Sequence, residues 1–549
     1  MKNSRKKKNG NEKGMVLVIV MFLLLVLSLI GIASITTSNS EMTVAGNELN
    51  QTGAFYAAES GIEKAAAAIA TSFEASGIPP SPLPTGSQTE GAYQYSYNTV
   101  ADGSAVQTTL TGGAYRGLYG LVRKYNITSA GVDNRRESSV TLKMAMRDAL
   151  IPLFQFAVFY QNDLEIAPGP NMTLGGRVHS NHDIYLMSES NVYIDGYLTS
   201  AENIIHGRKP GSGRSSSDGN VFIKDKDANY QNMKNTDGTW LDSQYASWVN
   251  TSLTRWGGTV EDNNHGITEL ELPVVTNGPA TNLVDRAAGN NDSFENKAGL
   301  KLVDGQAYFL SGTSWVNVTA TLIAQGVITS RTFYDAREGK NVASMDIDIG
   351  RLNSSGYYPT NGIIYASIPT VSGIVSAVRL RNAATLPRAT SIATNNPIYT
   401  VGNFNTVTKQ PASILADALT TLSGNWDDTR STQALANRVA TATQVNASFI
   451  TGTNETGANG QAYNGGLENI FRLLEKWDNI TMTWRGSAVS LWYSRQAIGA
   501  WSYGNYYTAP TRDWAFDTDL LNIANLPPGT PMVNIVQRTQ WYQIFAAAQ

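Results

Sequence analysis

The chain of 549 residues contains no cysteine, which excludes disulfides, thiolate metal sites and cysteine nucleophiles. Charge is also scarce, since Asp, Glu, Lys and Arg together make up only 15% of the residues. The net charge is −3, and the first 14 residues alone contribute +5, so residues 15–549 carry −8. A nucleic-acid-binding domain would show a basic patch, so we expect no nucleic-acid partner.

Long hydrophobic runs are absent except for one, at residues 15–35, which contains no charged residue. About 20 apolar residues suffice for a helix to cross a hydrocarbon core of ~30 Å. The basic residues before the run predict that the N-terminus stays in the cytoplasm and the rest lies outside. The alternative is a cleaved signal peptide. The run is longer than the apolar region of such peptides and no A-x-A site ends it, so we expect a retained anchor.

The helix is predicted to continue beyond the membrane. Residues 41–73 contain no proline, and apolar residues recur there at helical spacing. Alanine-rich "EKAAAAIA" at 63–70 has high helix propensity, and Pro79 and Pro80 end the helix. We therefore expect a transmembrane and amphipathic helix within residues 15–80, preceded by a cytoplasmic leader at 1–14.

A basic leader ending in Gly14, a charge-free span and an amphipathic continuation resemble a type IV prepilin. The segment "EMTVAGNELNQTGAFYAAESGIE" is similar to the N-terminal domain of PilX-type pilus assembly proteins. The resemblance implies that prepilin peptidase cuts between Gly14 and Met15 and methylates the new amino terminus. Most pilins carry a glutamate where this chain has Ile19. PilX-type proteins and some tip pseudopilins resemble this chain in lacking that glutamate, and its absence favours a minor or tip position over a repeating shaft.

The exported part divides into regions that differ in composition and in the pattern of apolar residues. Residues 81–150 begin with a linker and continue as alternating runs separated by turn signals, which predicts an antiparallel β head similar to that of a pilin. In residues 151–225, "DLEIAPGPNMTLGGRVHSNH" aligns with "DIYLMSESNVYIDGYLTSAE" at a period of 20. Such a period favours a β-solenoid, with two similar hairpins as the alternative. We expect an irregular α+β insertion at 226–388 and a second solenoid-like part with an aromatic-rich C-terminal cap at 389–549.

Few residues suggest chemistry. His179, His182, His206 and Asp183 are the one candidate metal cluster, but two of the histidines would face opposite sides of a strand, so no metal and no cofactor is expected. Asp346 and Asp348 share a strand face, as the paired carboxylates of a glycosidase do. Their alternation with apolar residues is better explained by an ordinary surface strand. We therefore expect no catalytic residues and no enzyme.

The aromatic-rich segment 491–514 is the strongest feature outside the anchor. Its side chains either cap the end of the β body or bind a sugar or a protein. Taken together, the sequence predicts a structural minor pilin, held in the bacterial inner membrane and then in a pilus or on the cell surface. The resemblance implies other pilins, the assembly machinery and prepilin peptidase as partners. A pilus-tip adhesin with a surface or glycan ligand, or an anchored polysaccharide hydrolase or lyase, remain the alternatives.

Overall fold

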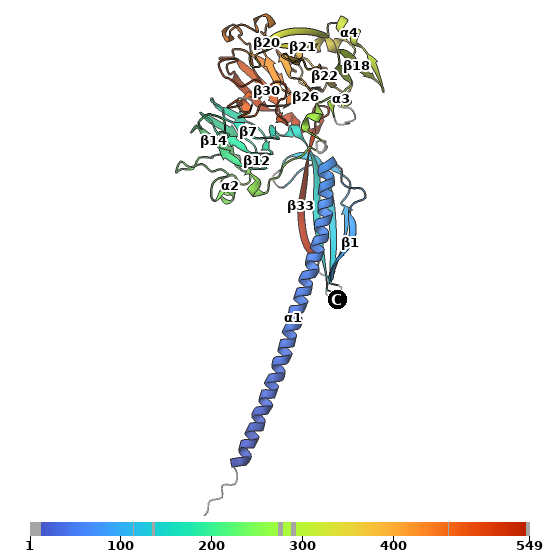
Figure 1. The fold of residues 1–549 in the computed structure, drawn as a ribbon, viewed down its shortest axis with the longest axis vertical. Helices are drawn as coiled ribbons and strands as arrows, with labels where there is room; N and C mark the ends of the chain where they lie inside the picture. The colour runs from blue at the N-terminus through green and yellow to red at the C-terminus, as the bar shows by residue number, and fades with distance from the viewer. Residues whose placement is uncertain are drawn as a thin grey trace, which may run out of the picture.

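The computed structural model describes residues 12–112, 115–133, 138–272, 278–286, 293–458 and 461–544. One helix, α1 (Glu12–Ser76), forms a stalk that carries a small head and a much larger body at its far end (Figure 1). At 1.5 Å per residue, its 65 residues extend for roughly 100 Å. The predicted class, a long apolar helix followed by a mainly β body, is confirmed.

The head is an antiparallel sheet wrapped against the upper part of α1. Small side chains of the helix, Ala54, Ala58 and Ala65, pack on Tyr125 and Leu142 of the sheet. The helix and sheet approach closely, since a Cβ at position 131 would lie 2.0 Å from the carbonyl oxygen of residue 54. The strands, in sheet order, are β1 (Thr85–Glu90), β2 (Tyr93–Ala101), β4 (Tyr119–Asp133), β5 (Ser138–Pro152) and β33 (Met532–Ile544), with β3 (Val106–Thr109) paired to β4.

The edge strand β33 differs from the sequence-based expectation, which placed all of 389–549 in the body. It pairs antiparallel with β5, from Met532 opposite Pro152 to Ile544 opposite Thr141. The body is therefore an insertion between two neighbouring strands of the head. Sequence alternation identifies a strand but not its partner, and here the partner lies almost 400 positions away.

The first half of the body is a β-solenoid, and parallel pairing excludes the two-hairpin alternative. Leu164 lies opposite Ile184, which lies opposite Ile204, at the predicted period of 20. Gly196 permits the close stacking, because a Cβ there would lie 2.0 Å from the Gly176 carbonyl oxygen. The faces are formed by β7 (Leu164–Ile166), β10 (Ile184–Leu186) and β13 (Ile204–His206); by β8 (Met172–Leu174), β11 (Asn191–Ile194), β14 (Asn220–Lys224) and β15 (Tyr230–Asn232); and by β9 (Val178–Ser180) and β12 (Leu198–Ser200).

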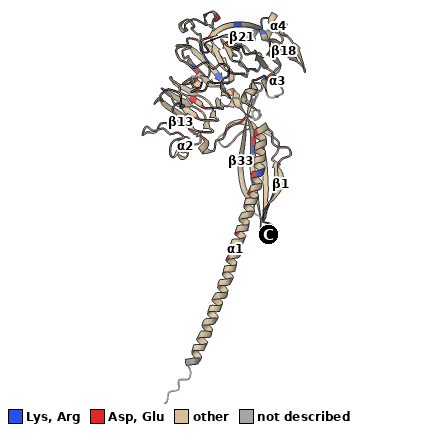
Figure 2. Cartoon of the chain, in the orientation of Figure 1, with Lys and Arg blue, Asp and Glu red and all other residues tan. Residues whose placement is uncertain are grey.

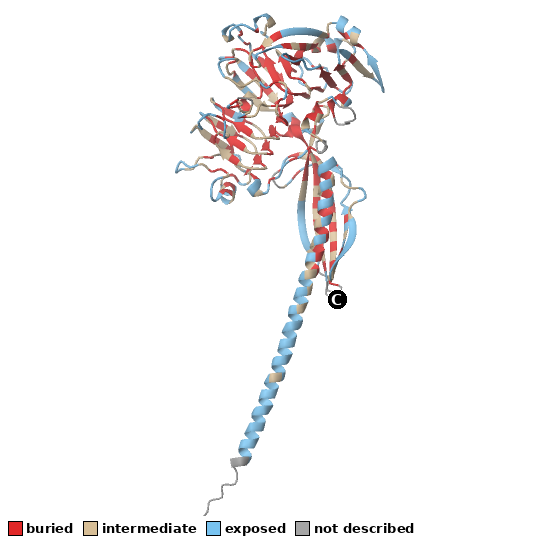
Figure 3. Ribbon diagram, viewed as in Figure 1, coloured by how far each residue is buried: buried red, intermediate tan, exposed pale blue. Residues whose placement is uncertain are grey.

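The two halves of the body share one twelve-stranded sheet. Its junction is the parallel pair of β6 (Val158–Tyr160) and β31 (Ala488–Ser490), which places the last coil of the body beside the first. The whole body thus has a continuous apolar core, seen as the buried strands in Figure 3. The other members are β16 (Val260–Glu261), β29 (Ser448–Thr451), β26 (Ala412–Ala416), β24 (Thr390–Thr394), β22 (Ile363–Ser367), β17 (Leu300–Val303), β18 (Gln306–Ser311) and β19 (Ser314–Asn317).

An α+β region interrupts the coils, although it occupies less of 226–388 than the sequence suggests. Strands β22 and β23 (Val375–Arg381) lie inside that range yet belong to the parallel stack. The sequence did not predict this, because these short Val/Ile-rich strands pair without a fixed period. The remaining strands are β20 (Ile328–Asp335), β21 (Lys340–Asp348), β25 (Ile398–Val401), β27 (Leu419–Leu422), β28 (Thr443–Asn446), β30 (Thr481–Gly486) and β32 (Thr511–Phe516). The short helices are α2 (Trp248–Trp256), α3 (Phe294–Lys297), α4 (Thr319–Ala324) and α5 (Ile349–Ser354).

Candidate functional sites: the exposed helix and an aromatic groove

The lower part of α1 is apolar and uncovered. Its most hydrophobic window has a mean hydropathy of 3.2, none of that window is buried, and between Lys13 and Glu41 no residue is charged (Figures 2 and 3). The first buried side chain of the helix is Ala54. An exposed apolar surface of this length requires lipid or other helices around it.

The predicted processing position lies at the beginning of this helix. Gly14 and Met15 are both exposed, and within the described residues no atom beyond the helix lies within 4 Å of where a Gly14 Cβ would be. Ile19 is 57% exposed and is not a carboxylate.

A groove of about 960 Å³ lies on the body, where segments distant in sequence meet. The loop after β13 contributes Arg208 and Arg214, the segment around η7 (Leu467–Asn469) contributes Tyr463 and Glu468, and the aromatic-rich segment contributes Trp501. The sequence indicated the aromatic segment alone. It did not indicate the other segments that line the groove. The insertion "GSGRSSSDGN" in the third coil does, however, contain Arg214.

The groove is built around stacked rings and guanidinium groups. Tyr463 and Trp501 meet edge to face, with centroids 5.5 Å apart. The guanidinium carbon of Arg208 lies 4.6 Å from the Tyr463 centroid, and that of Arg214 lies 4.8 Å from the Trp501 centroid. Each such contact stabilises the arrangement by roughly 0.5–2 kcal/mol. Burial raises the pKa of the Glu468 carboxyl, which also lines the groove.

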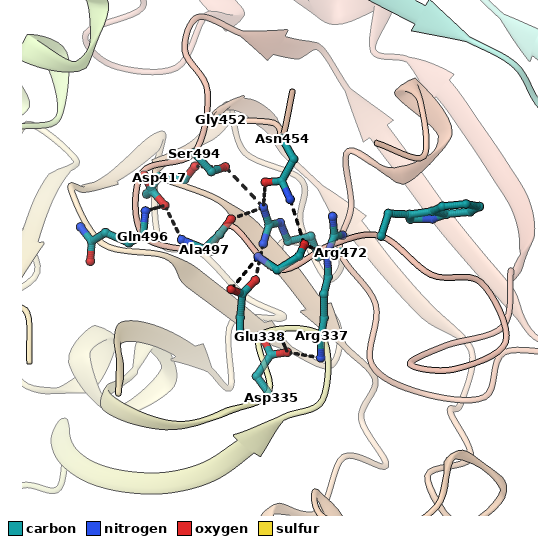
Figure 4. Close-up of polar contacts among 12 residues, drawn as sticks. Asp335, Arg337, Glu338, Asp417, Gly452, Asn454, Arg472, Ser494, Gln496 and Ala497 are labelled. Atoms are coloured by element: carbon teal, nitrogen blue, oxygen red, sulfur yellow. Dashed lines mark hydrogen bonds and ion pairs between the residues drawn. The ribbon is translucent and has the colours of Figure 1, made fainter. Parts of the chain in front are cut away.

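A buried polar network holds the aromatic segment onto the body (Figure 4). The Arg472 guanidinium donates to Glu338 Oε1 at 2.7 Å, to Asn454 Oδ1 at 2.8 Å and to the carbonyl oxygen of Ala497. Glu338 Oε2 in turn accepts from the backbone N–H of residue 499 at 2.8 Å. These charge-assisted bonds fix the segment that leads to Trp501.

Two further residues complete this network. The side chain of Asp417 accepts three backbone N–H bonds, from Arg495 at 2.7 Å and from Gln496 and Ala497 at 3.0 Å each. Arg337 Nε donates to the carbonyl oxygen of residue 499 at 3.0 Å. Burial and the adjacent Arg472 lower the pKa of the Arg337 guanidinium to about 9. The network explains why the aromatic segment takes one defined path.

The candidate histidines have separate surroundings. His179 is fully buried, hydrogen-bonded to Thr199 and Asn181, and burial lowers its pKa to about 4. His206 stacks on Trp240 with centroids 3.4 Å apart. His182 lies 3.2 Å from Glu202. The potential ligand atoms of His182, Glu202 and Asp163 lie within 4.8 Å of one another, but Asp163 is already ion-paired to Lys209 at 2.8 Å.

The two aspartates considered for hydrolysis have structural partners. Asp346 is buried and accepts two hydrogen bonds from Arg379, at 2.8 and 2.7 Å, and a third from Ser344. Asp348 caps α5 by accepting from the backbone N–H of Arg351 at 2.9 Å. These contacts give both carboxylates a structural role in the body.

Comparisons with known proteins agree with the N-terminal geometry. Residues 13–63, all within α1, match the model of the PilX N-terminal family. A search of curated proteins gave no match. Among solved structures, the competence-associated pilin ComZ from Thermus thermophilus aligns over 90% of this chain and 98% of its own, at 11% identity and a TM-score of 0.27. Residues 13–63 are therefore similar to the N-terminal segment of the PilX family.

Proposed function

Because α1 carries the PilX N-terminal domain, we propose that the protein is a minor pilin that enters or primes a type IV pilus-like filament. The observation that supports this most directly is the bare apolar half of α1. Its surface suits the lipid bilayer before assembly and the helices of other pilins afterwards. The basic leader orients the head and body outside the cytoplasm, with a single span in the inner membrane.

The body supports a tip position. It is inserted at the end of the head that lies farthest from the apolar half of α1 (Figure 1). In a shaft, that end of each head faces the subunit ahead of it, and a body of this size would obstruct that neighbour. The absence of a glutamate at Ile19 agrees with a subunit that meets few neighbours of its own kind.

The proposed processing is tested by the intact mass and N-terminal sequence of the protein from its own host, with and without prepilin peptidase. We expect a methylated Met15 at the terminus, and the full leader when the peptidase is removed. Gly14→Leu should block cleavage, whereas the matched change Gly10→Leu in the same leader should leave it unchanged. A terminus between residues 28 and 45 would indicate signal peptidase and contradict the proposal.

The proposed position is tested by immunogold labelling of sheared filaments with an antibody against the body. Label at one end of each filament is expected. Label distributed along the shaft would contradict a tip position, and no label on any filament would contradict incorporation.

A further inference from the structure

The groove contains cationic groups whose hydrogen bonds are incomplete. The side chain of Arg208 is 5% exposed, its nearest carboxylate is Glu189 at 3.7 Å, and its Nη1 has no hydrogen-bond partner among the described residues. Arg512, on the same groove, has an unpartnered buried Nε within the described part of the chain. Both nitrogens are buried and cannot contact a ligand directly, so these two arginines contribute positive charge behind the surface of the groove.

A third arginine faces outward. Arg214 is exposed, stacks on Trp501, and forms no ion pair within the ranges that the structure describes. The carboxylate nearest to Arg208, that of Glu189, is 56% exposed and lies 3.7 Å away, beyond hydrogen-bonding distance. Arg214 therefore favours a ligand that carries a carboxylate group.

The rest of the lining fits a sugar. Tyr503 is 56% exposed and meets Tyr507 edge to face, which leaves a ring available for the C–H face of a pyranose. Asn171, Asn479 and Asp478 supply amide and carboxylate groups for hydroxyls. The aliphatic lining residues are only alanine and proline, which provide no deep apolar pocket for a peptide anchor.

We propose that this groove binds an acidic oligosaccharide, with a carboxylate of the sugar on Arg214 and a pyranose ring on Tyr503. The groove lies wholly on the body, so the binding does not depend on entry of the chain into a filament.

The test uses the full-length protein in detergent and isothermal titration calorimetry. The probes are a galacturonic acid hexamer, a sialylated oligosaccharide, the carboxyl-reduced hexamer and single-stranded DNA. We expect saturable binding of one acidic sugar that weakens as salt is raised, and at least tenfold weaker binding of the reduced hexamer. Which acid binds, uronate or sialate, identifies the source of the glycan.

Two exposed groove residues provide the variants, because their replacement should not disturb folding. Arg214→Gln and Tyr503→Ala should each weaken binding about tenfold or more. The matched changes Arg331→Gln, at an exposed arginine on β20, and Tyr56→Ala, at a 60% exposed tyrosine of α1, should leave it unchanged. Equal binding of the neutral hexamer, preference for DNA, no saturable binding of either acid, or insensitivity to both groove variants would overturn the proposal.

Discussion

Glu165 on β7 should make the folded body less stable as the pH rises from about 4.5 to about 7. Its side chain is 4% exposed, Oε2 accepts from the Thr456 hydroxyl at 2.5 Å, and Oε1 has no partner among the described residues. Burial, which exceeds the opposing hydrogen bond, raises its pKa from 4.5 to about 7. Between these two values the folded state binds more protons than the unfolded state, so unfolding becomes easier with rising pH.

The magnitude follows from the size of the shift. One pKa unit corresponds to about 1.4 kcal/mol, so the free energy of unfolding should fall by ~3 kcal/mol across this range. Glu165→Gln removes the titration and keeps an acceptor for Thr456. The assay is urea unfolding of both proteins in detergent at pH 4.5, 6 and 7.5, followed by tryptophan fluorescence. The other titrating groups are the same in both proteins. The free energy of unfolding of the variant, relative to that of the wild type, should therefore increase by ~3 kcal/mol from pH 4.5 to pH 7.5. A constant difference at all three pH values would refute the reasoning.

Other changes test the head and the body. Gly131→Val should lower the free energy of unfolding by about 1–3 kcal/mol or more, because its side chain would collide with the backbone of Ala54; an unchanged melting temperature would contradict the packing of α1 on β4. Asp346→Asn should cost about 3–5 kcal/mol in a denaturant titration, because Arg379 would lose half of its buried pairing, and a small effect would mean that the pair is not formed. Deletion of 532–549 should expose β5 and make the head sensitive to limited proteolysis while the body resists it, whereas an equally resistant head would show that β33 is dispensable.

Local patterns were sufficient for the helix and for the first coils. The charge-free run and the stop at Pro79 and Pro80 fixed α1 to within a few residues, because helix periodicity and membrane length are properties of one segment. The 20-residue repeat located six strands of the solenoid in the correct register. In contrast, "LENIFRLLEKW" at 467–477 has the composition of a helix, yet only Leu467–Asn469 forms a 3-10 turn. Here contacts from the surrounding coils outweigh the helix propensity of the segment.

The groove could not be predicted from the sequence because its walls come from several segments, distant in sequence, that are brought together by folding. Arg208 and Tyr463 are separated by more than 250 positions, and neither belongs to a recognisable motif. Asp346 illustrates a second limit of the sequence. Its alternation with apolar neighbours indicated an ordinary surface strand, and the strand is present, but Asp346 is buried on it. Only the fold shows that Arg379 is its partner.

The pairing of β33 with β5 also sets an order of events during export. In the proposed export the head leaves the membrane first, yet its sheet acquires its last strand only when residues 532–544 have been translocated. A chain that is stalled or cut within the body would then present an unfinished head above an intact anchor. In the proposed filament, completion of the far end of the chain would therefore be a condition for assembly of the subunit.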